Sequence, residues 1–388
     1  MRNYKELMDR LLTLPTCALV TTGRTGTDLL QSLLDEHPEV LLFNGSLRYY
    51  AYWNSSICVS SGTFAISDYV DEFIGKYLER FKSRYDLLEG KDRLGNNFDQ
   101  SLDIDLVQYK REVLCLLEGR NVTPKNSLVA IYAAYALCLG QDIDSKALLF
   151  HHPHHFDELD AFLADFPDSK VIVMTRDPRA NFVSGIDHWR KYWSGVDDGR
   201  HLYKYIARIL ADATVLEDRA IDYMVVRIEW LGSRRVIQCL CDWLNIAYNE
   251  CLTRSTWGGL TWHGDRVSKK TNVQAGWSSD MLENKWETNL SVKDKYVLGF
   301  VMSNRLKHYG YPYKNINIVD AIIMPFLIML PLRYETRFFT LAYFRKHKPR
   351  GGITLTLRNI VFYLRRVHLF MKYYARIIRK DEFSCRFV

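Results

Sequence analysis

The sequence predicts an α/β fold in which a parallel β-sheet is flanked by helices. Short apolar runs alternate with helix-periodic stretches, which is the pattern of βαβ units. The expected strands are residues 17–21, 40–43, 147–150, 170–175 and 223–228, and the clearest of them reads KVIVMT. The expected helices are residues 27–36, 68–86, 105–119, 127–140, 155–166, 200–219, 233–244 and 291–307. Residues 44–66 and 250–280, rich in Ser, Thr, Gly and Trp, are expected to form long loops.

Length and composition are those of a folded protein. The 388 residues are 48% hydrophobic and 25% charged, which excludes a disordered or collagen-like chain. Eight cysteines without a CxxC pair or Cys/His zinc spacing favour reduced thiols and no metal site. Residues 1–14 are charged and helix-periodic, unlike a signal peptide, so a cytoplasmic protein is expected.

The charge is divided unevenly along the chain. Residues 333–388 carry 14 Lys and Arg against 3 Asp and Glu, so the rest of the chain is mildly acidic despite the net charge of +7. The two parts therefore need separate explanations. We expect an α/β domain over residues 1–314 and a C-terminal segment, residues 315–388, that is apolar, basic and helical.

A glycine-containing turn between the first strand and the first helix of the sheet is the strongest local motif. It reads Thr21-Thr22-Gly23-Arg24-Thr25-Gly26-Thr27. Its two glycines allow a tight turn, and the amides of the turn and of the helix start can converge on an anion. It is not a Walker A loop, which needs four residues between its glycines and then Lys-Ser/Thr. The alternative is an ordinary strand-to-helix turn.

A second motif follows the strand KVIVMT. Arg176 ends this strand, and Ser184 lies eight residues further on. A guanidinium fork and a hydroxyl at that spacing can hold one phosphate from two sides. The alternative is a surface pair of Asp177 and Arg179 with Pro178 at a helix start.

Together these motifs resemble those of the sulfotransferase superfamily. TGRTGTDLLQSLLDEHPEV, from Thr22, resembles its 5′-phosphosulfate loop, and FPDSKVIVMTRDPRANFVS, from Phe166, resembles its 3′-phosphate segment. VVRIEWL (225–231) and SKKTNVQAGW (268–277) resemble two later segments more loosely. The resemblance spans about residues 15–310 and implies a P-loop-like fold that binds 3′-phosphoadenosine 5′-phosphosulfate (PAPS) without a metal. It implies cofactor binding by Gly23, Arg24, Thr25, Gly26, Thr27, Asp28, Arg176 and Ser184, completed by Lys269, Lys270 or Asn272.

The proton acceptor for the acceptor hydroxyl is where the chain departs from this family. Many relatives supply a Glu shortly after the His-Pro that follows the first helix, but residues 41–46 contain no acid here. The histidine run at 151–155 is the substitute, with His152 where relatives often carry Lys; neutral it could be a base, and protonated a cation. We expect Arg24, His152 and His155 to be catalytic. The alternatives are that these histidines cap the next helix, or that the base is Glu36, Glu39, or His263 with Asp265.

Aromatic residues in the expected loops suggest a sugar-binding pocket. Sugars stack on such side chains while polar neighbours bind the hydroxyls, and we expect substrate contacts from Tyr49, Trp53, His263 and Asp265. The alternative for the aromatic residues is core packing.

The C-terminal segment has the pattern of a membrane-surface element. Residues 321–332 are uncharged and contain Pro325 and Pro331, too short and too kinked to cross a bilayer. A helix expected over residues 357–380 has an apolar stripe surrounded by Lys and Arg, which favours an anionic membrane surface. The stripe is Ile360, Val361, Leu364, Val367, Met371, Tyr374 and Ile378; the cations are Arg358, Arg365, Arg366, Lys372, Arg376, Arg379 and Lys380. The alternative is packing on the body or on a second copy.

The sequence therefore predicts a PAPS-dependent sulfotransferase acting on a hydroxyl of a glycan or lipid-linked glycan, peripheral on the cytoplasmic face of a membrane. A noncatalytic membrane-associated scaffold and a P-loop phosphoryl-transfer enzyme are the alternatives, and the missing Walker Lys-Ser/Thr argues against the second. No nucleic-acid motif is present, so no nucleic-acid partner is expected; a homo-oligomer is left open.

Overall fold

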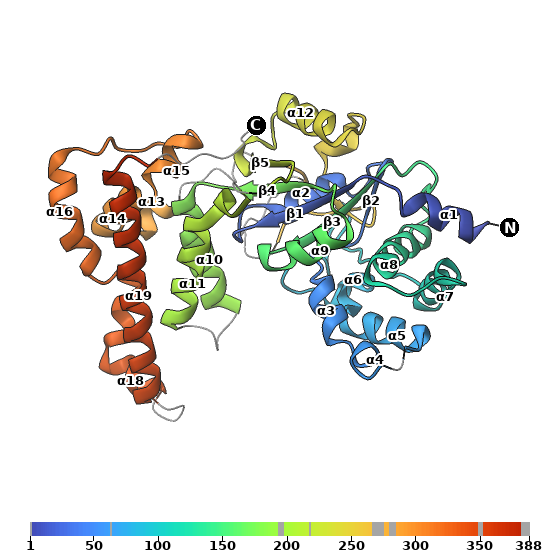
Figure 1. Ribbon diagram of the computed structural model, residues 1–388, viewed down its shortest axis with the longest axis horizontal. Helices are drawn as coiled ribbons and strands as arrows, with labels where there is room; N and C mark the ends of the chain where they lie inside the picture. Colours follow the sequence, from blue (N-terminus) through green and yellow to red (C-terminus); the bar gives the residue numbers. More distant parts are fainter. Residues whose placement is uncertain are drawn as a thin grey trace.

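Five parallel strands form the central sheet in the order β2-β3-β1-β4-β5. The computed structural model describes residues 2–62, 64–192, 198–216, 219–265, 275–278, 285–347 and 352–381. The strands are β1 (Thr16–Thr21), β2 (Val40–Leu42), β3 (Leu148–His154), β4 (Lys170–Thr175) and β5 (Tyr223–Arg227). All five expected strands are present and helices flank the sheet, so the predicted fold class is confirmed (Figure 1).

The helices connect these strands and continue beyond the last one. The first half of the chain contains α1 (Tyr4–Leu11), α2 (Thr27–Leu34), α3 (Tyr49–Ser55), α4 (Ile57–Ser60), α5 (Ile66–Lys76), α6 (Leu78–Phe81), α7 (Leu106–Leu117), α8 (Pro124–Cys138), α9 (Leu159–Asp165) and α10 (Pro178–Tyr192). The second half contains α11 (Gly199–Ala211), α12 (Arg234–Leu244), α13 (Lys285–Asn289), α14 (Val292–Val301), α15 (Ser303–His308), α16 (Ile318–Met329), α17 (Arg333–Thr336), α18 (Leu341–His347) and α19 (Gly352–Ile378). A short antiparallel ribbon joins β6 (Thr256–Trp257) to β7 (Leu260–Thr261).

Two apolar layers cover the sheet because alternate strand residues face opposite sides. Cys17 and Leu19 of β1 belong to one core with residues of α2 and α12. Ala18 and Val20 belong to the other core with residues of α8, α9, α10 and α11. Figure 1 shows α12 on one side of the strands and α9 on the other. A sheet buried on both faces explains why its strands read as continuous apolar runs.

Two segments differ from the sequence-based expectation. β3 extends to His154, so most of the histidine run that was expected to follow the strand forms its end. Residues 44–66, expected as a long loop, contain α3 and α4, and the aromatic side chains of α3 pack into the core. The Ser, Asn and Gly residues of this segment are typical of a loop. Burial of Tyr49 and Tyr52 nevertheless stabilises α3 as a helix.

The C-terminal helices are packed onto the rest of the chain. α19 lies along α11 and α14, and α16 lies against α14 and α19 (Figure 1). The predicted domain boundary at residue 314 stays a prediction. The C-terminal helix α19 packs on α11 and α14, and both of these lie before that residue. Pro325 lies inside α16 rather than breaking it, and the helix ends at Met329, before Pro331. None of the helices that the structure describes combines the length and apolar composition needed to cross a bilayer.

One basic residue of α19 is not where the sequence pattern placed it. Arg366 was expected beside the exposed stripe, but its side chain is completely buried and forms a bidentate ion pair with Glu335. It also donates to the backbone carbonyls of Ile328 and Leu330 at the end of α16. Arg366 therefore joins α16, α17 and α19, and buried charges persist only with such partners.

Candidate active site

The carboxyl ends of the strands bring several of the predicted site residues to one edge of the sheet. In the strand register, Val20 of β1 lies beside His154 of β3, Thr21 beside Met174 of β4, and Thr175 beside Arg227 of β5. Ligands of open α/β sheets bind at this edge, where the loops after the strands meet. The turn that follows β1 is the central one.

The backbone of this turn is fixed by its glycines and by hydroxyl contacts. Gly23, Arg24 and Gly26 have φ values of 99°, 55° and 90°. A Cβ on Gly26 would lie 2.3 Å from Cδ1 of Ile228, which explains the second glycine. The hydroxyl of Thr21 accepts from the amide of Gly23 at 2.9 Å and bonds to the hydroxyl of Thr25. A non-glycine residue at positive φ, here Arg24, is typical of functional turns.

The start of α2 fits an anion. Its N-cap is Gly26, and no side chain caps the first turn. The first amides of a helix lack intrahelical partners, and the helix dipole favours negative charge there. The predicted cofactor residues Gly23, Arg24, Thr25, Gly26, Thr27 and Asp28 therefore form one turn and helix start with the properties of a phosphate site.

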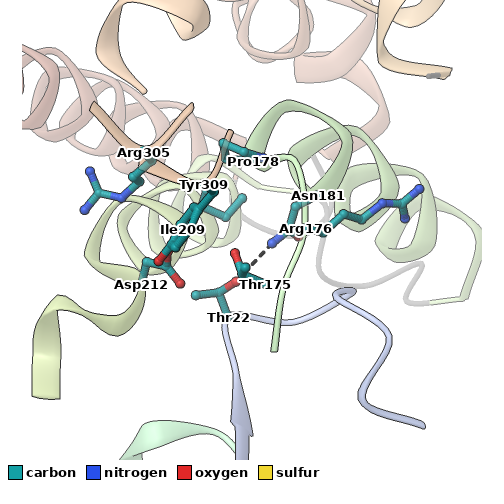
Figure 2. A pocket seen from close by; sticks show the side chains of 9 residues that line it. All are labelled: Thr22, Thr175, Arg176, Pro178, Asn181, Ile209, Asp212, Arg305 and Tyr309. Carbon is teal, nitrogen blue, oxygen red and sulfur yellow. Dashed lines mark hydrogen bonds between the residues drawn. The ribbon is translucent and has the colours of Figure 1, made fainter. Parts of the chain in front are cut away.

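Two residues that the motif analysis did not single out brace this turn. Asn181 of α10 donates through its side chain to the hydroxyl of Thr22 at 2.9 Å (Figure 2). The hydroxyl of Tyr205 of α11 bonds to the side-chain oxygen of Asn181, and it lies 3.0 Å from the carbonyl oxygen of Asn181 and 3.3 Å from that of Gly23. Asn181 lies within the RDPRANFVS motif, so its position in a predicted phosphate-binding segment was a signal that the sequence offered. Tyr205 lies in an ordinary helical pattern, which offered no sequence signal of this contact.

Arg24 is oriented by Asp265. One guanidinium nitrogen of Arg24 lies 3.0 Å from a carboxylate oxygen of Asp265, and both side chains are mostly buried. The Nε atom of Arg24 is buried without a hydrogen-bond partner among the described residues. The structure thus joins a predicted cofactor residue to a predicted substrate residue, and it leaves a donor of Arg24 available for a further acceptor.

The carboxyl of Asp28 has a raised pKa. Burial, together with the negative charges of Glu89 and Asp265, raises the pKa of this carboxyl to about 7, although Lys91 and Arg24 act in the opposite direction. A carboxyl that titrates near neutrality in the first turn of a phosphate-type helix start is typical of a functional site.

A buried charged cluster that the sequence analysis missed lies beside the turn. Arg80 forms a bidentate pair with Glu89, at 2.8 and 3.3 Å, and Lys91 lies 2.6 Å from the same carboxylate. Lys91 also donates to the side chain of Asn44 at 2.9 Å and lies over the ring of Trp257. Burial alone would raise the pKa of Glu89, but Arg80 and Lys91 hold it well below its usual range. No motif in residues 80–91 marks this cluster; only the fold assembles it.

The histidines of β3 face opposite sides of the sheet in turn. His151 faces α8 and α9, where Nδ1 lies 2.7 Å from the hydroxyl of Tyr132 and the ring stacks on Phe162. His152 faces α2, and its Nδ1 lies 2.7 Å from the side-chain oxygen of Gln31. Nδ1 of His154 lies 3.2 Å from Nε2 of His152. His152 is completely buried, so it cannot itself reach a substrate as the sequence analysis expected.

The hydrogen bonds fix the tautomers of this chain. The amide nitrogen of Gln31 donates to the carbonyls of Phe43 (2.6 Å) and Gly45 (3.3 Å), so its oxygen faces His152. An amide oxygen only accepts, and Nδ1 of His152 must therefore carry a hydrogen. In a neutral His152 the Nε2 atom then accepts from Nδ1 of His154. The lone pair of His154 is thereby left on Nε2.

Both histidines are neutral at pH 7. Burial lowers the pKa of His152 well below its usual value. Burial lowers the pKa of His154 to about 4, with Arg208, Arg24 and Arg80 acting in the same direction and Glu89 against them. Burial therefore favours the neutral form of His152 over the protonated form that was the other alternative.

His155 lies outside this chain of hydrogen bonds. Its Nε2 lies 3.5 Å from Nη1 of Arg208, and its ring contacts His154. Burial and the charge of Arg208 lower the pKa of His155 to about 3. The predicted catalytic role of His155 stays a prediction, and the contacts favour His154 instead.

Arg176 and Ser184 are on neighbouring elements. Arg176 follows β4, and Ser184 lies on α10; both are half-buried. A small polar pocket next to the turn is lined by Thr22, Thr175, Arg176, Pro178, Asn181, Ile209, Asp212, Arg305 and Tyr309 (Figure 2). The alternative pair also forms: Arg179 lies 2.7 Å from Asp177, and Pro178 begins α10. That pair is buried rather than on the surface.

The predicted substrate residues other than Asp265 are engaged in packing or in hydrogen bonds within the chain. Tyr49 is completely buried and donates to the carbonyl of Pro124, so it offers no surface to a substrate, and that prediction is wrong. Trp53 is half-buried against Tyr69 and Phe64. Nε2 of His263 lies 3.1 Å from the carbonyl of Gly95, and its ring packs on Phe98.

Part of the late segment lies outside the described residues, including Lys269, Lys270 and Asn272. Its end is described. Trp277 donates to the carbonyl of Ile228 at 3.0 Å, and Ile228 is the residue that contacts Gly26. The end of the segment therefore lies beside the turn.

Solved structures similar to this chain are sulfotransferases, the superfamily that the motifs resemble. The sulfotransferase domain of the Synechococcus PCC 7002 olefin synthase is 17% identical with a TM-score of 0.36, over 71% of this chain and 87% of that one. The sulfotransferase domain of the curacin biosynthetic pathway is 13% identical with a TM-score of 0.33, over 78% and 99%. Sulfotransferase STF9 of Mycobacterium avium is 15% identical with a TM-score of 0.32, over 64% and 67%. No protein-family model and no curated protein sequence matches the chain.

Proposed function

We propose that the chain is a sulfotransferase that uses PAPS and transfers the sulfuryl group to a hydroxyl of a glycan or lipid-linked glycan. The observation that carries the proposal is the meeting of three features at one sheet edge. These are the uncapped start of α2, the buried guanidinium of Arg24 and the neutral His154. An anion site beside an uncharged proton acceptor suits group transfer from an anionic donor to a hydroxyl.

The residues around the turn fit the two ends of the donor. The amides of residues 23–28 and Arg24 would hold the 5′-phosphosulfate, since the unpartnered Nε of Arg24 is a donor in need of an acceptor. Arg176 and Ser184 would hold the 3′-phosphate from the next strand and helix. When bound, PAPS supplies the activated sulfuryl group. Fixed donors of the chain stabilise negative charge that grows on the phosphate side without having to reorganise.

His154 is the proton acceptor in this proposal. Gln31 and His152 orient it and leave its Nε2 lone pair available, at the strand end that adjoins the turn. A base must carry a lone pair and lie within hydrogen-bond reach of the attacking hydroxyl. His152 and Gln31 are then positioning residues, and Arg24 remains the charge-stabilising residue that the sequence analysis expected.

Binding and turnover test the proposal separately. Calorimetry should show that 3′-phosphoadenosine 5′-phosphate binds more tightly than ATP with Mg²⁺. Labelled PAPS should then label one or more members of a panel of soluble and lipid-linked glycans. Preference for ATP with Mg²⁺ would favour phosphoryl transfer, and nucleotide binding without any turnover would favour a noncatalytic binding protein.

A further inference from the structure

Exposed apolar side chains are concentrated in the C-terminal part of the described chain. Most of the large hydrophobic side chains that the described residues leave exposed lie between residues 318 and 378. On α16, Ile318 is 78% exposed, Ile322 64% and Phe326 70%. Soluble monomers rarely expose contiguous apolar surface on this scale unless it binds something.

Only one side of α16 packs against other described elements of the chain. Met324 and Ile328 are buried on one side, where α14 and α19 cover the helix. Asp320, its only charged residue, is also on that side and bonds to Lys314. The opposite side carries Ile318, Ile322 and Phe326 and has no covering element among the described residues. A helix that is apolar all round is normally buried all round.

The exposed stripe of α19 lies on the same side of the molecule. α16 and α19 run antiparallel, since Tyr363 bonds to the carbonyl of Met329 at one end and Tyr374 to that of Ala321 at the other. On α19 the side that carries Asn359, Arg366 and Phe370 is buried against α11, α14 and α16. Helical spacing puts the exposed residues of both helices on the side away from α11 and α14. We name this surface the C-terminal apolar face: Ile318, Ile322, Phe326 and Met329 of α16 with Ile353, Leu357, Ile360 and Leu364 of α19.

Positive charges that no acidic residue of the described chain pairs with border this face. Arg365, Lys372 and Arg379 recur every seven residues and therefore form one row along α19. All three are exposed, and none forms an ion pair within the described part of the chain. Glu335 is the only acidic residue between 321 and 380, and Arg366 already neutralises it in the interior.

We propose that the C-terminal apolar face docks on an anionic lipid surface, with α16 lying in the interface and the cations of α19 at the headgroups. Figure 1 shows α16, α18 and α19 together at the end of the molecule opposite the N-terminus, where a flat surface can approach them. An apolar helix face edged by unpaired cations matches the two attractions of an anionic bilayer, burial and charge. A protein partner would have to supply acidic groups to match the same cations. This inference is independent of the proposed transfer reaction.

Vesicle flotation of the full chain tests the proposal. The wild type should float with vesicles of equal parts phosphatidylcholine and phosphatidylglycerol, and much less with phosphatidylcholine alone. Ile322→Glu with Phe326→Glu should reduce the floating fraction at least about 10-fold, because both side chains would enter the acyl boundary. Arg365→Gln, Lys372→Gln and Arg379→Gln together should weaken binding by about 100-fold and flatten its salt dependence.

Matched controls separate the face from nonspecific effects. Ile57→Glu with Val107→Glu places the same charges on exposed apolar residues of α4 and α7. The triple variant Arg2→Gln, Lys5→Gln, Arg93→Gln removes as many exposed cations outside the C-terminal segment. Both control variants should float like the wild type, and all variants should keep the wild-type circular dichroism and unfolding midpoint.

Three results would overturn the proposal. The first is a wild type that does not bind anionic vesicles at low salt, and the second is an Ile322→Glu, Phe326→Glu variant that still binds them. The third is a concentration-dependent dimer, detected by sedimentation, that dissociates in this variant while vesicles are ignored; the face would then be a contact between two copies.

Discussion

Nδ1 of His154 lies 3.2 Å from Nε2 of His152, on the same side of strand β3. They meet on the side that faces α2, at the irregular end of the strand, where the register with β1 shifts and His154 has a φ of 73°. Gln31 of α2 therefore meets His152 and sets the tautomer of both rings. The histidines at the end of β3 thus form a hydrogen-bonded chain that leaves the lone pair of His154 on Nε2.

His154→Ala should lower turnover by about 10²–10⁴-fold, the range for loss of a general base. The affinity for 3′-phosphoadenosine 5′-phosphate should stay nearly unchanged, because His154 is not placed on the nucleotide. Exogenous imidazole should restore part of the rate of this variant, which a purely structural role would not allow. Steady-state rates with a labelled donor measure both effects.

A control variant and a positioning variant accompany this prediction. His201→Ala on α11, where His201 pairs with Asp198, should leave the rate within about 3-fold of wild type, since it removes a histidine away from the strand end. Gln31→Ala should lower the rate less than His154→Ala, because it loosens the tautomer without removing the base. Equal rates for His154→Ala and wild type would exclude His154 while leaving the sulfotransferase activity intact.

The pH dependence of nucleotide binding should follow Asp28. Its carboxyl, which faces Arg24, Lys91, Glu89 and Asp265, has a pKa raised to about 7 mainly by burial. Below that pH Asp28 is neutral; above it, it is negative and repels an anion at the start of α2. Affinity for 3′-phosphoadenosine 5′-phosphate should therefore fall as pH rises through about 7.

Asp28→Asn is the matched test of that dependence. This variant should bind the nucleotide with an affinity that no longer falls through pH 7, because no carboxyl ionises. Its folded state should also be more stable than wild type at pH 8, since a carboxyl with a raised pKa destabilises the fold whenever it is charged. Calorimetry at several pH values measures the first effect; an unchanged pH profile would assign the titration to another group.

Arg176→Ala should distinguish nucleotides by their 3′-phosphate. Loss of a buried charge-assisted contact costs roughly 2–4 kcal/mol, so affinity for 3′-phosphoadenosine 5′-phosphate should fall by about 30-fold or more. Affinity for adenosine 5′-phosphosulfate, which lacks that phosphate, should barely change. Arg200→Ala, an exposed arginine on α11, serves as control. Equal losses for both ligands would remove Arg176 from this role.

Gly26→Ala should disrupt the turn for two separable reasons. Its φ of 90° strains any side chain by about 1–2 kcal/mol, and its new Cβ would collide with Ile228. Gly140→Ala has a φ of 69° and open space around the new Cβ, so it measures strain alone. Nucleotide affinity should fall at least 10-fold in Gly26→Ala, and adding Ile228→Ala should recover part of it. If the affinity does not recover, backbone strain rather than the collision with Ile228 makes glycine necessary at position 26.

The sheet was predictable because its signals are local. Each strand is a short apolar run of β-type residues between helical patterns, and burial on both faces keeps that run uninterrupted. α3 was missed because the composition of residues 44–66 is that of a loop, and only tertiary burial of Tyr49 and Tyr52 makes it a helix. His152 and His154 were read as loop residues because histidine does not mark a strand.

Those parts of the site that lie within a single sequence motif were predictable. The turn at 22–28 and the Arg176 segment carry their chemistry in sequence order, so their position at the sheet edge followed from the fold. Arg80, Glu89 and Lys91 reach the same place from a segment without any motif, and the Arg24–Asp265 pair joins residues 241 positions apart. Long-range pairing of this kind is a property of the packed chain.

Arg365 and Arg366 provide the last test, because the sequence treats them alike and the structure does not. Arg366→Met should destabilise the protein by about 3–5 kcal/mol, since it leaves the carboxylate of Glu335 buried and unpaired. Arg365→Met, at an exposed position, should change the free energy of unfolding by less than about 0.5 kcal/mol. Adding Glu335→Leu to Arg366→Met should recover part of the loss. The recovery stays incomplete because Arg366 also satisfies the carbonyls of Ile328 and Leu330 at the end of α16. Urea unfolding measures all four chains, and equal costs for the two arginines would mean that Arg366 is not buried in solution.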